Sequence, residues 1–275
     1  MQEAKTQQTV IKAVMERAAI RRTWPALTLL WMVGSSVAEE PLPPPIEALK
    51  HQGIEIYGAF DAPSGLTGYG ALDQGRETAV YLLPDGEHAI VGTLTDANGN
   101  DVSANELDTH LRVPLEAETW RLLEASHWIQ DGDPEAPRLV YLFTDPNCPY
   151  CREFWQRTRP AVAEGRLQLR HIMVGFMAPQ SPAQAASLLA AEDPEAALNA
   201  HESGTPIEAS AQPRAIEEQV YHNNQLFDAL GLHATPTLAY QRETPTGLRI
   251  VRIQGLPDAP GWEAMIEPVD EKNNN

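Results

Sequence analysis

The two cysteines of this 275-residue chain, Cys148 and Cys151, are the residues best suited to chemistry. Only Pro149 and Tyr150 separate them. A disulfide-stabilised scaffold needs more cysteines at wider spacing, and a structural zinc site needs a second Cys or His pair at ligand spacing. A permanent bond across so short a spacing would close almost no loop and add little stability. The spacing therefore predicts a redox-active Cys148–Cys151 disulfide that is broken and re-formed during function.

The pair lies where a predicted strand meets a predicted helix. Residues 138–144 form a nearly continuous apolar run, as expected of a buried strand, and the helical pattern begins just after the cysteines. Cys148 then falls at a helix N-terminus, where unpaired N–H groups and the helix dipole stabilise a thiolate, and Pro149 suits the first turn. We expect Cys148 to be the nucleophile, with a pKa below the free value of ~8.5, and Cys151 to be the shielded, resolving thiol.

Two folded domains are predicted around this junction. Residues 39–105 are interpreted as a small sheet domain with one helix, 106–133 as a helical linker, 134–270 as the catalytic domain and 271–275 as a disordered tail. The strands and helices of the catalytic domain alternate in an order that favours an α/β layout with a mixed sheet. Its expected strands cover residues 138–144, 167–174, 235–240 and 248–254, and its expected helices cover 152–159, 181–191, 213–230 and 261–266.

Local patterns give further expectations. Residues 105–130 have a helical pattern, and Pro160 is expected to stop or kink the helix that follows the cysteines. Phe154 and Trp155 should lie on the buried face of that helix. In the N-terminal domain the expected helix covers residues 46–51 and the expected strands cover 53–60, 77–83 and 88–95.

An export signal is predicted at the N-terminus. Two arginines precede a mostly apolar run at residues 24–33, and Ser36 and Ala38 satisfy the small-residue rule for signal peptidase. Residues 1–38 are therefore expected to be a signal peptide, with Met15 as an alternative start because the segment before the arginines is long. Outside the cytosol disulfides persist, so a lone CxxC pair there must be actively oxidised or actively reduced.

The composition limits the partners of the chain. Hydrophobic residues make up 43% of it, enough for a buried core, and the formal net charge is −18. This charge argues against nucleic acid or an anionic membrane as the main partner, because both bind basic surfaces. No cofactor and no metal are expected, since the cysteine motif contains no further ligand.

Several segments of the chain have a recognisable sequence: IEALK at 46–50, GI at 53–54, FDAP at 60–63, YLLPDGEHAIVG at 81–92, SHWIQDG at 126–132, DPNCPYCREFW at 145–155 and TP at 235–236. Through these segments the chain resembles the DsbC/DsbG family of periplasmic thiol:disulfide interchange proteins. The Pro149–Tyr150 dipeptide and the absence of further cysteines resemble DsbG more than DsbC.

This resemblance implies a fold and partners. Residues 39–105 would form a cystatin-like dimerisation domain of a V-shaped homodimer, and 134–270 a thioredoxin-like domain with a helical insertion. The expected clients are misfolded or oxidised exported proteins in the periplasm, and a DsbD-type membrane electron donor would keep the pair reduced.

Thr235 and Pro236 are the second candidate feature. An X-Pro bond adopts the cis form more readily than other bonds, and this one opens a predicted strand. In a thioredoxin-like fold such a proline faces the cysteine pair and presents backbone to the substrate. The alternative is an ordinary trans proline at the start of a strand.

The hypothesis is that the CPYC dithiol isomerises or reduces non-native disulfides in exported proteins, and sulfenic acids through the same mixed disulfide. Two alternatives stay open: a dithiol oxidase that introduces disulfides, and a periplasmic holdase chaperone that would work without its thiols. A role in metal binding or copper delivery ranks last, because it needs a ligand outside the motif.

Overall fold

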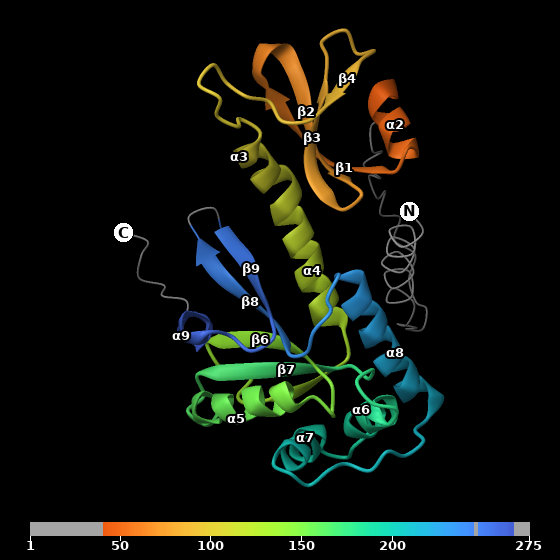
Figure 1. Ribbon diagram of the computed structural model, residues 1–275, viewed down its shortest axis with the longest axis vertical. Coiled ribbons are helices and arrows are strands. Elements are labelled where there is room, and N and C mark those ends of the chain that lie inside the picture. Colours follow the sequence, from red (N-terminus) through yellow and green to blue (C-terminus); the bar gives the residue numbers. More distant parts are fainter. Residues whose placement is uncertain (1–40, 245–246, 267–275) are drawn as a thin grey trace, which may run out of the picture. The chain divides into compact units, whose positions relative to one another are not determined.

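The computed structural model describes residues 41–244 and 247–266, and its contacts separate the chain into two compact units (Figure 1). The division falls within one helix, after Glu118. The predicted signal peptide at 1–38 and the predicted tail at 271–275 lie outside the described residues. None of the helices in the described ranges has the length and apolar character needed to cross a bilayer.

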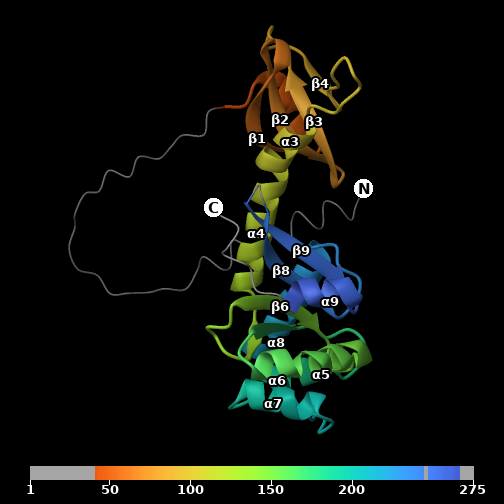
Figure 2. The same ribbon diagram turned by 90° about the vertical axis from the view of Figure 1, so that its left-hand side faces the viewer.

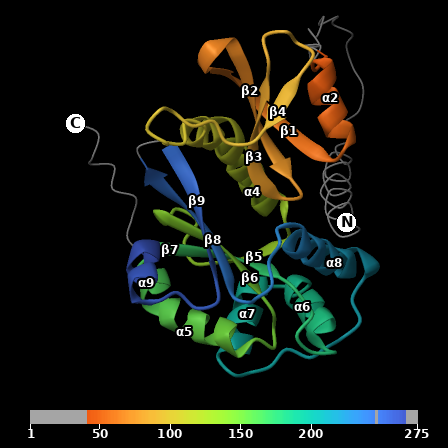
Figure 3. The same ribbon diagram turned by 45° about the horizontal axis from the view of Figure 1, so that its top comes forward.

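The first unit contains an antiparallel sheet with a helix packed against it (Figure 3). Its strands, in spatial order, are β1 (Ile54–Ala62), β2 (Leu66–Asp73), β3 (Arg76–Leu82) and β4 (Ala89–Val91). The helix α2 (Pro44–His51) buries Ile46 against Val80 of the sheet. These two side chains are fully buried, so α2 and the sheet share one hydrophobic core.

A helical segment closes the other core of this unit. The short α3 (Ala104–Leu107) continues through a π-helical turn at Asp108–Arg112 into α4 (Val113–Ala125). Leu111 in the turn is fully buried and packs in one cluster with Phe60 of β1. The π-helical turn therefore presents an apolar side chain to the sheet without ending the helix.

The strand β2 was absent from the sequence prediction because glycines interrupt its pattern. Gly68 and Gly70 lie within it, and glycine weakens a strand pattern. The structure explains both residues by close packing: a Cβ at position 68 would lie 2.1 Å from the ring of Phe60, and one at position 70 would lie 2.9 Å from the Cβ of Leu111. The two glycines therefore leave space for the side chains of Phe60 and Leu111 in the core.

The second unit is built on a mixed sheet, as predicted, with five strands where the sequence predicts four. Its strands, in spatial order, are β5 (Trp128–Asp131), β7 (Leu167–Met173), β6 (Arg138–Thr144), β8 (Thr237–Thr244) and β9 (Gly247–Gln254). Only β6 and β7 run parallel among these neighbouring pairs of described strands. Its helices are α5 (Pro149–Ala163), α6 (Ser181–Leu189), α7 (Pro194–Glu202), α8 (Arg214–Ala229) and α9 (Ala259–Ile266) (Figure 2).

Helices cover both faces of this sheet. Because side chains alternate along a strand, Leu142 and Phe143 of β6 enter different cores. Leu142 lies in a cluster with Phe154 of α5 and Trp262 of α9, whose rings stack with centroids 5.1 Å apart. Phe143 lies in another cluster with Phe227 of α8. The central strand is therefore buried on both sides, as its continuous apolar sequence predicts.

Two predicted helix ends differ from the structure. The helical pattern assigned to 105–130 ends at Ala125, and β5 follows as a strand paired with β7. A strand this short has too few residues for its alternation to outweigh the preceding helical pattern. Pro160 does not end α5, which continues to Ala163. Pro160 lies in the last turn, and Ala161 after it is buried in the core, which offsets the lost hydrogen bond.

The helical block between β7 and β8 is also more divided than expected. The sequence predicts helices at 181–191 and 213–230, which α6 and α8 confirm, but it does not separate α7. Asp193 caps α7 by accepting a hydrogen bond from the Ala196 N–H at 3.0 Å, and Pro194 occupies its first turn. This Asp-Pro start is the local signal that could have identified the helix.

Candidate functional site

Cys148 caps the N-terminus of α5. It has extended backbone angles, and α5 begins at the next residue, Pro149. The backbone N–H of Cys151 donates to Cys148 Sγ at 3.3 Å, so the sulfur takes the place of the usual capping oxygen. The Arg152 N–H donates to the Cys148 carbonyl oxygen at 3.3 Å. The nucleophile candidate is thus aligned with the positive end of the helix.

The environments of the two sulfurs differ. The structure carries both residues as thiols, and Cys148 and Cys151 are 4% and 1% exposed. A hydrogen bond from the Cys151 side chain, opposed by burial, lowers the pKa of Cys148 to about 6. Burial, reinforced by the neighbouring Cys148, raises the pKa of Cys151 well above its ordinary value. At neutral pH this arrangement favours a thiolate on Cys148 and a thiol on Cys151.

The Thr235–Pro236 bond is cis and lies beside the cysteines. Cys148 Sγ, as a thiol, donates to the carbonyl oxygen of Thr235 at 3.3 Å. This contact joins residues 87 positions apart in the sequence. Tyr150 has its side chain turned outward and is 59% exposed. The structure therefore brings together the predicted pair, the dipeptide between them and the predicted proline.

A buried carboxylate organises the loop before the cysteines. Asp145 is fully buried and accepts hydrogen bonds through both oxygens. Oδ1 accepts from the Asn147 N–H at 2.9 Å and from Ser181 Oγ at 2.7 Å. Oδ2 accepts from the N–H groups of Phe176 and Met177 at 2.8 and 3.0 Å. One side chain thus connects the loop before the cysteines to α6 and to the segment after β7, a role that the sequence analysis missed.

Asn147 extends this network. Its Nδ2 donates to Ser181 Oγ at 2.9 Å and to Gln184 Oε1 at 2.8 Å, and its Oδ1 accepts from Gln180 at 3.2 Å. The polar sequence Asp-Pro-Asn before the first cysteine is the only local signal for these contacts. Their partners in α6 lie more than thirty residues away, so spacing alone could not identify them.

Exposed apolar side chains lie near the nucleophile candidate. Phe176 and Met177 are each 48% exposed, and Thr235 Oγ1 donates to Met177 Sδ at 3.3 Å. Together with the exposed Tyr150, they place apolar surface next to Cys148. Large exposed apolar side chains at a reactive centre are suited to contact with polypeptide.

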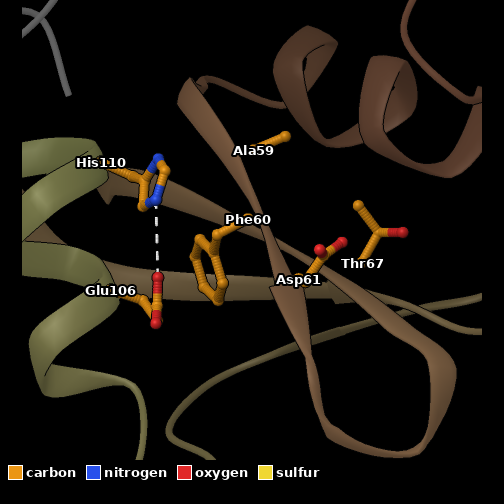
Figure 4. Close-up of a pocket in the computed structure, with 6 residues that line it drawn as sticks. All are labelled: Ala59, Phe60, Asp61, Thr67, Glu106 and His110. Atoms are coloured by element: carbon orange, nitrogen blue, oxygen red, sulfur yellow. Dashed lines mark ion pairs between the residues drawn. The ribbon is translucent and has the colours of Figure 1, made fainter.

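The first unit contains a separate cavity of about 480 Å³, lined by Ala59, Phe60, Asp61, Thr67, Glu106 and His110 (Figure 4). His110 Nε2 and Glu106 Oε2 lie 3.5 Å apart across one helical turn. None of the site residues predicted from the sequence lines this cavity. Across the described residues, no three His, Cys, Asp or Glu side chains are grouped as a metal site.

Comparison with known proteins gives consistent matches. Residues 131–269 match the family model of the thioredoxin-like domain. The chain is 46% identical over 246 residues to the thiol:disulfide interchange protein DsbG of Pseudomonas aeruginosa, covering 88% of this chain and 94% of that one. It is 39% identical to DsbG of Escherichia coli K12, covering 84% and 94%. The solved structure of Helicobacter pylori DsbG is 16% identical, with a TM-score of 0.40, covering 71% of this chain and 98% of the other.

Proposed function

The chain belongs to the DsbG family of thiol:disulfide interchange proteins, and we propose that Cys148 and Cys151 are its catalytic dithiol. The observation that carries this assignment is the asymmetry of the two sulfurs. Cys148 caps a helix and has a pKa of about 6, whereas the pKa of the buried Cys151 is raised. A low-pKa thiol beside a protonated partner is the arrangement that attack followed by resolution requires.

The first chemical step is attack by the Cys148 thiolate on one sulfur of a substrate disulfide. A new bond joins Cys148 to that substrate sulfur, the substrate S–S bond breaks, and the other substrate sulfur leaves as a thiolate. Thr235 and Pro236 lie beside the reacting sulfur, and the Thr235 carbonyl accepts a hydrogen bond from Cys148 at 3.3 Å only while Cys148 is a thiol. Pro149 and Tyr150 complete the first turn of the helix that holds the nucleophile.

The mixed disulfide has two outcomes. If another thiol of the substrate attacks the substrate sulfur, Cys148 leaves as a thiolate and the substrate is isomerised. If Cys151 loses its proton and attacks Cys148, the Cys148–Cys151 disulfide forms and the substrate leaves reduced. A substrate sulfenic acid enters the same sequence when the Cys148 thiolate displaces its hydroxyl group, which leaves as water after protonation.

The wider setting follows from membership in the family. We propose that residues 1–38 direct export to the periplasm and that the clients are misfolded or oxidised exported proteins. Residues 39–105 are proposed to form the dimerisation domain of a homodimer and 134–270 the catalytic domain. The proposed linker, 106–133, also contributes Leu111 to the core of the first unit and β5 to the sheet of the second. A DsbD-type membrane electron donor would return the oxidised pair to the dithiol.

Trapping of mixed disulfides tests the catalytic assignment. Cys151→Ser keeps the nucleophile but removes the resolving thiol, so it should accumulate Cys148-linked complexes with a scrambled disulfide substrate. Cys148→Ser should form none and should lose isomerase and reductase activity. Absence of mixed disulfides in Cys151→Ser, together with full protection of an unfolded client from aggregation by Cys148→Ser, would refute the dithiol mechanism and leave a thiol-independent holdase.

The redox state in cells tests the direction of electron flow. Alkylation of acid-trapped protein should find Cys148 and Cys151 mostly reduced, since an isomerase needs a free thiolate. A mostly oxidised pair would contradict the proposed role and favour a dithiol oxidase.

A further inference from the structure

The helical insertion, which comprises α6, α7 and α8 between β7 and β8, places a buried carboxyl group near the loop before the cysteines. The end of α7 carries His201 and Glu202, which are 2% and 3% exposed. His201 Nε2 donates to the carbonyl oxygen of Pro146 at 2.7 Å, and Arg152 donates to the His201 carbonyl at 3.4 Å. Pro146 precedes the cysteine pair and Arg152 follows Cys151 directly. The end of α7 therefore contacts the chain on both sides of the redox pair.

Glu202 has limited charge compensation in this position. Arg152 faces it with Nε 3.6 Å from Oε2, but this Nε makes no hydrogen bond among the described residues, and the Arg152 side chain is 41% exposed. Arg159, a second cation acting on Glu202, is itself paired with Asp131. His201 contributes no charge, because burial lowers its pKa and its Nδ1 accepts a backbone hydrogen bond at 3.1 Å.

The protonation of Glu202 and that of Cys148 are linked. Burial raises the pKa of Glu202 to about 7; Arg152 opposes this shift and the charge on Cys148 adds to it. Cys148, with a pKa of about 6, loses its proton first. Its thiolate then helps to retain the proton on Glu202, since two negative charges in one buried region repel each other. A disulfide removes the thiolate charge, so Glu202 then ionises at lower pH.

We propose that Glu202 is a positioning residue of the redox pair that stays protonated while Cys148 is a thiolate and releases its proton when Cys148 enters the disulfide. The inference rests on the dithiol function proposed for Cys148 and Cys151. It assigns to the helical insertion a part in setting the charge of the active site.

The proton balance of the reaction supports this role. The reduced site holds a Cys148 thiolate, a Cys151 thiol and a Glu202 carboxylic acid. The two sulfurs give two electrons to the substrate disulfide, which becomes two thiols by taking the protons of Cys151 and Glu202 through solvent. The site is left with the Cys148–Cys151 disulfide and a Glu202 carboxylate. One negative charge is present before and after, so the buried region does not change its net charge.

Glu202→Gln tests the proposal through the number of protons taken up on reduction. The redox equilibrium with glutathione would be measured between about pH 6 and pH 8, and each proton taken up changes the ratio of reduced to oxidised protein by about tenfold per pH unit at fixed potential. Below about pH 7, where Glu202 of the reduced protein is still protonated, and above the lower pKa that Glu202 takes in the oxidised protein, the wild-type slope should exceed one proton and approach two. Glu202→Gln should show a slope of one.

Matched variants separate this role from a general charge effect. Glu153 on α5 has 48% of its side chain exposed. Glu153→Gln therefore removes the same carboxylate charge at an exposed position, and the pH dependence of its redox equilibrium should match that of the wild type. Glu202→Asp should retain the steeper segment. If Glu202→Gln fails to fold, Arg152→Gln removes the facing cation and should move the steep segment to higher pH.

The outcomes are distinct. The role of Glu202 would be overturned if the redox equilibrium of the wild type and of Glu202→Gln had the same dependence on pH. It would also be overturned if the steep part of this dependence stayed at the same pH in Arg152→Gln. Either result would leave the dithiol function intact. A wild-type protein that does not equilibrate with glutathione at all would overturn both.

Discussion

Replacing Cys151 with alanine should raise the pKa of the Cys148 thiol. That pKa is about 6, and the hydrogen bond from the Cys151 side chain is the largest cause of its depression, with burial acting against it. A hydrogen bond to a charged group contributes about 1.5–3 kcal/mol, and one pKa unit corresponds to about 1.4 kcal/mol. The expected rise is therefore about one to two units. The backbone N–H of residue 151, which also donates to the sulfur, remains in the variant and should keep the pKa below the free value.

The rise can be measured by thiolate absorbance or by the rate of alkylation as a function of pH. At pH 7 a pKa of about 6 corresponds to roughly 90% thiolate, and a pKa of about 7 to 8 corresponds to roughly 50% to 10%. The alkylation rate of Cys148 at pH 7 should therefore fall by about two- to tenfold. Cys151→Ser retains a hydroxyl donor, so its shift should be smaller than that of Cys151→Ala.

An unchanged pKa in Cys151→Ala would refute this reasoning. It would mean that the helix N-terminus and its backbone N–H groups stabilise the thiolate without the second side chain. Equal shifts in the serine and alanine variants would show that the loss of sulfur, rather than the loss of a hydrogen-bond donor, is responsible.

Three further predictions concern stability. Because the folded pKa of Cys148 is depressed to about 6, its contribution to stability is complete only above the unfolded pKa of ~8.5 and is lost as pH falls through about 6. Relative to Cys148→Ser, the reduced protein should gain about 2 kcal/mol between pH 7 and pH 9, measured by denaturant titration. Asp145→Ala leaves several buried donors unpaired and should lower the free energy of unfolding by more than about 3 kcal/mol. Asp145→Asn keeps one acceptor oxygen and should lower it by less. Equal losses of stability in the two variants, measured in thermal melts, would contradict the hydrogen-bond explanation. Gly68→Ala places a Cβ 2.1 Å from the Phe60 ring and should lower the free energy of unfolding by about 1–3 kcal/mol through overpacking. Adding Phe60→Leu should restore part of this stability. If no stability is restored, the ring is not the cause of the overpacking.

The sequence predicted those features of the site that depend on neighbours along the chain. A strand followed at once by Asp-Pro-Asn-Cys-Pro-Tyr-Cys places Cys148 at a helix N-terminus, and the structure puts it at the N-cap of α5. Phe154 and Trp155 are buried as the helical spacing requires. The mixed sheet also followed from the order of apolar segments. These are local properties, set by hydrogen bonding and side-chain periodicity within a few residues.

The sequence pattern was insufficient where packing overrides local preference. Strand β2 contains glycines that lower its strand signal, yet they are required by the large side chains packed against them. Strand β5 is only four residues long and follows a helical pattern, but its pairing with β7 fixes its conformation. In both cases the deciding neighbours come from other parts of the chain.

The cysteine motif, its place at the start of a helix and the order of strands and helices were determined by the sequence itself, because each depends on residue types at short spacing. Tertiary structure alone decided what surrounds the sulfurs. It brings the Thr235 carbonyl to Cys148 across 87 positions, forms four hydrogen bonds around Asp145, and buries Glu202 with Arg152 Nε 3.6 Å from its carboxylate. The physical reason is that burial and electrostatic coupling depend on distances in space, which residue types at short spacing do not determine.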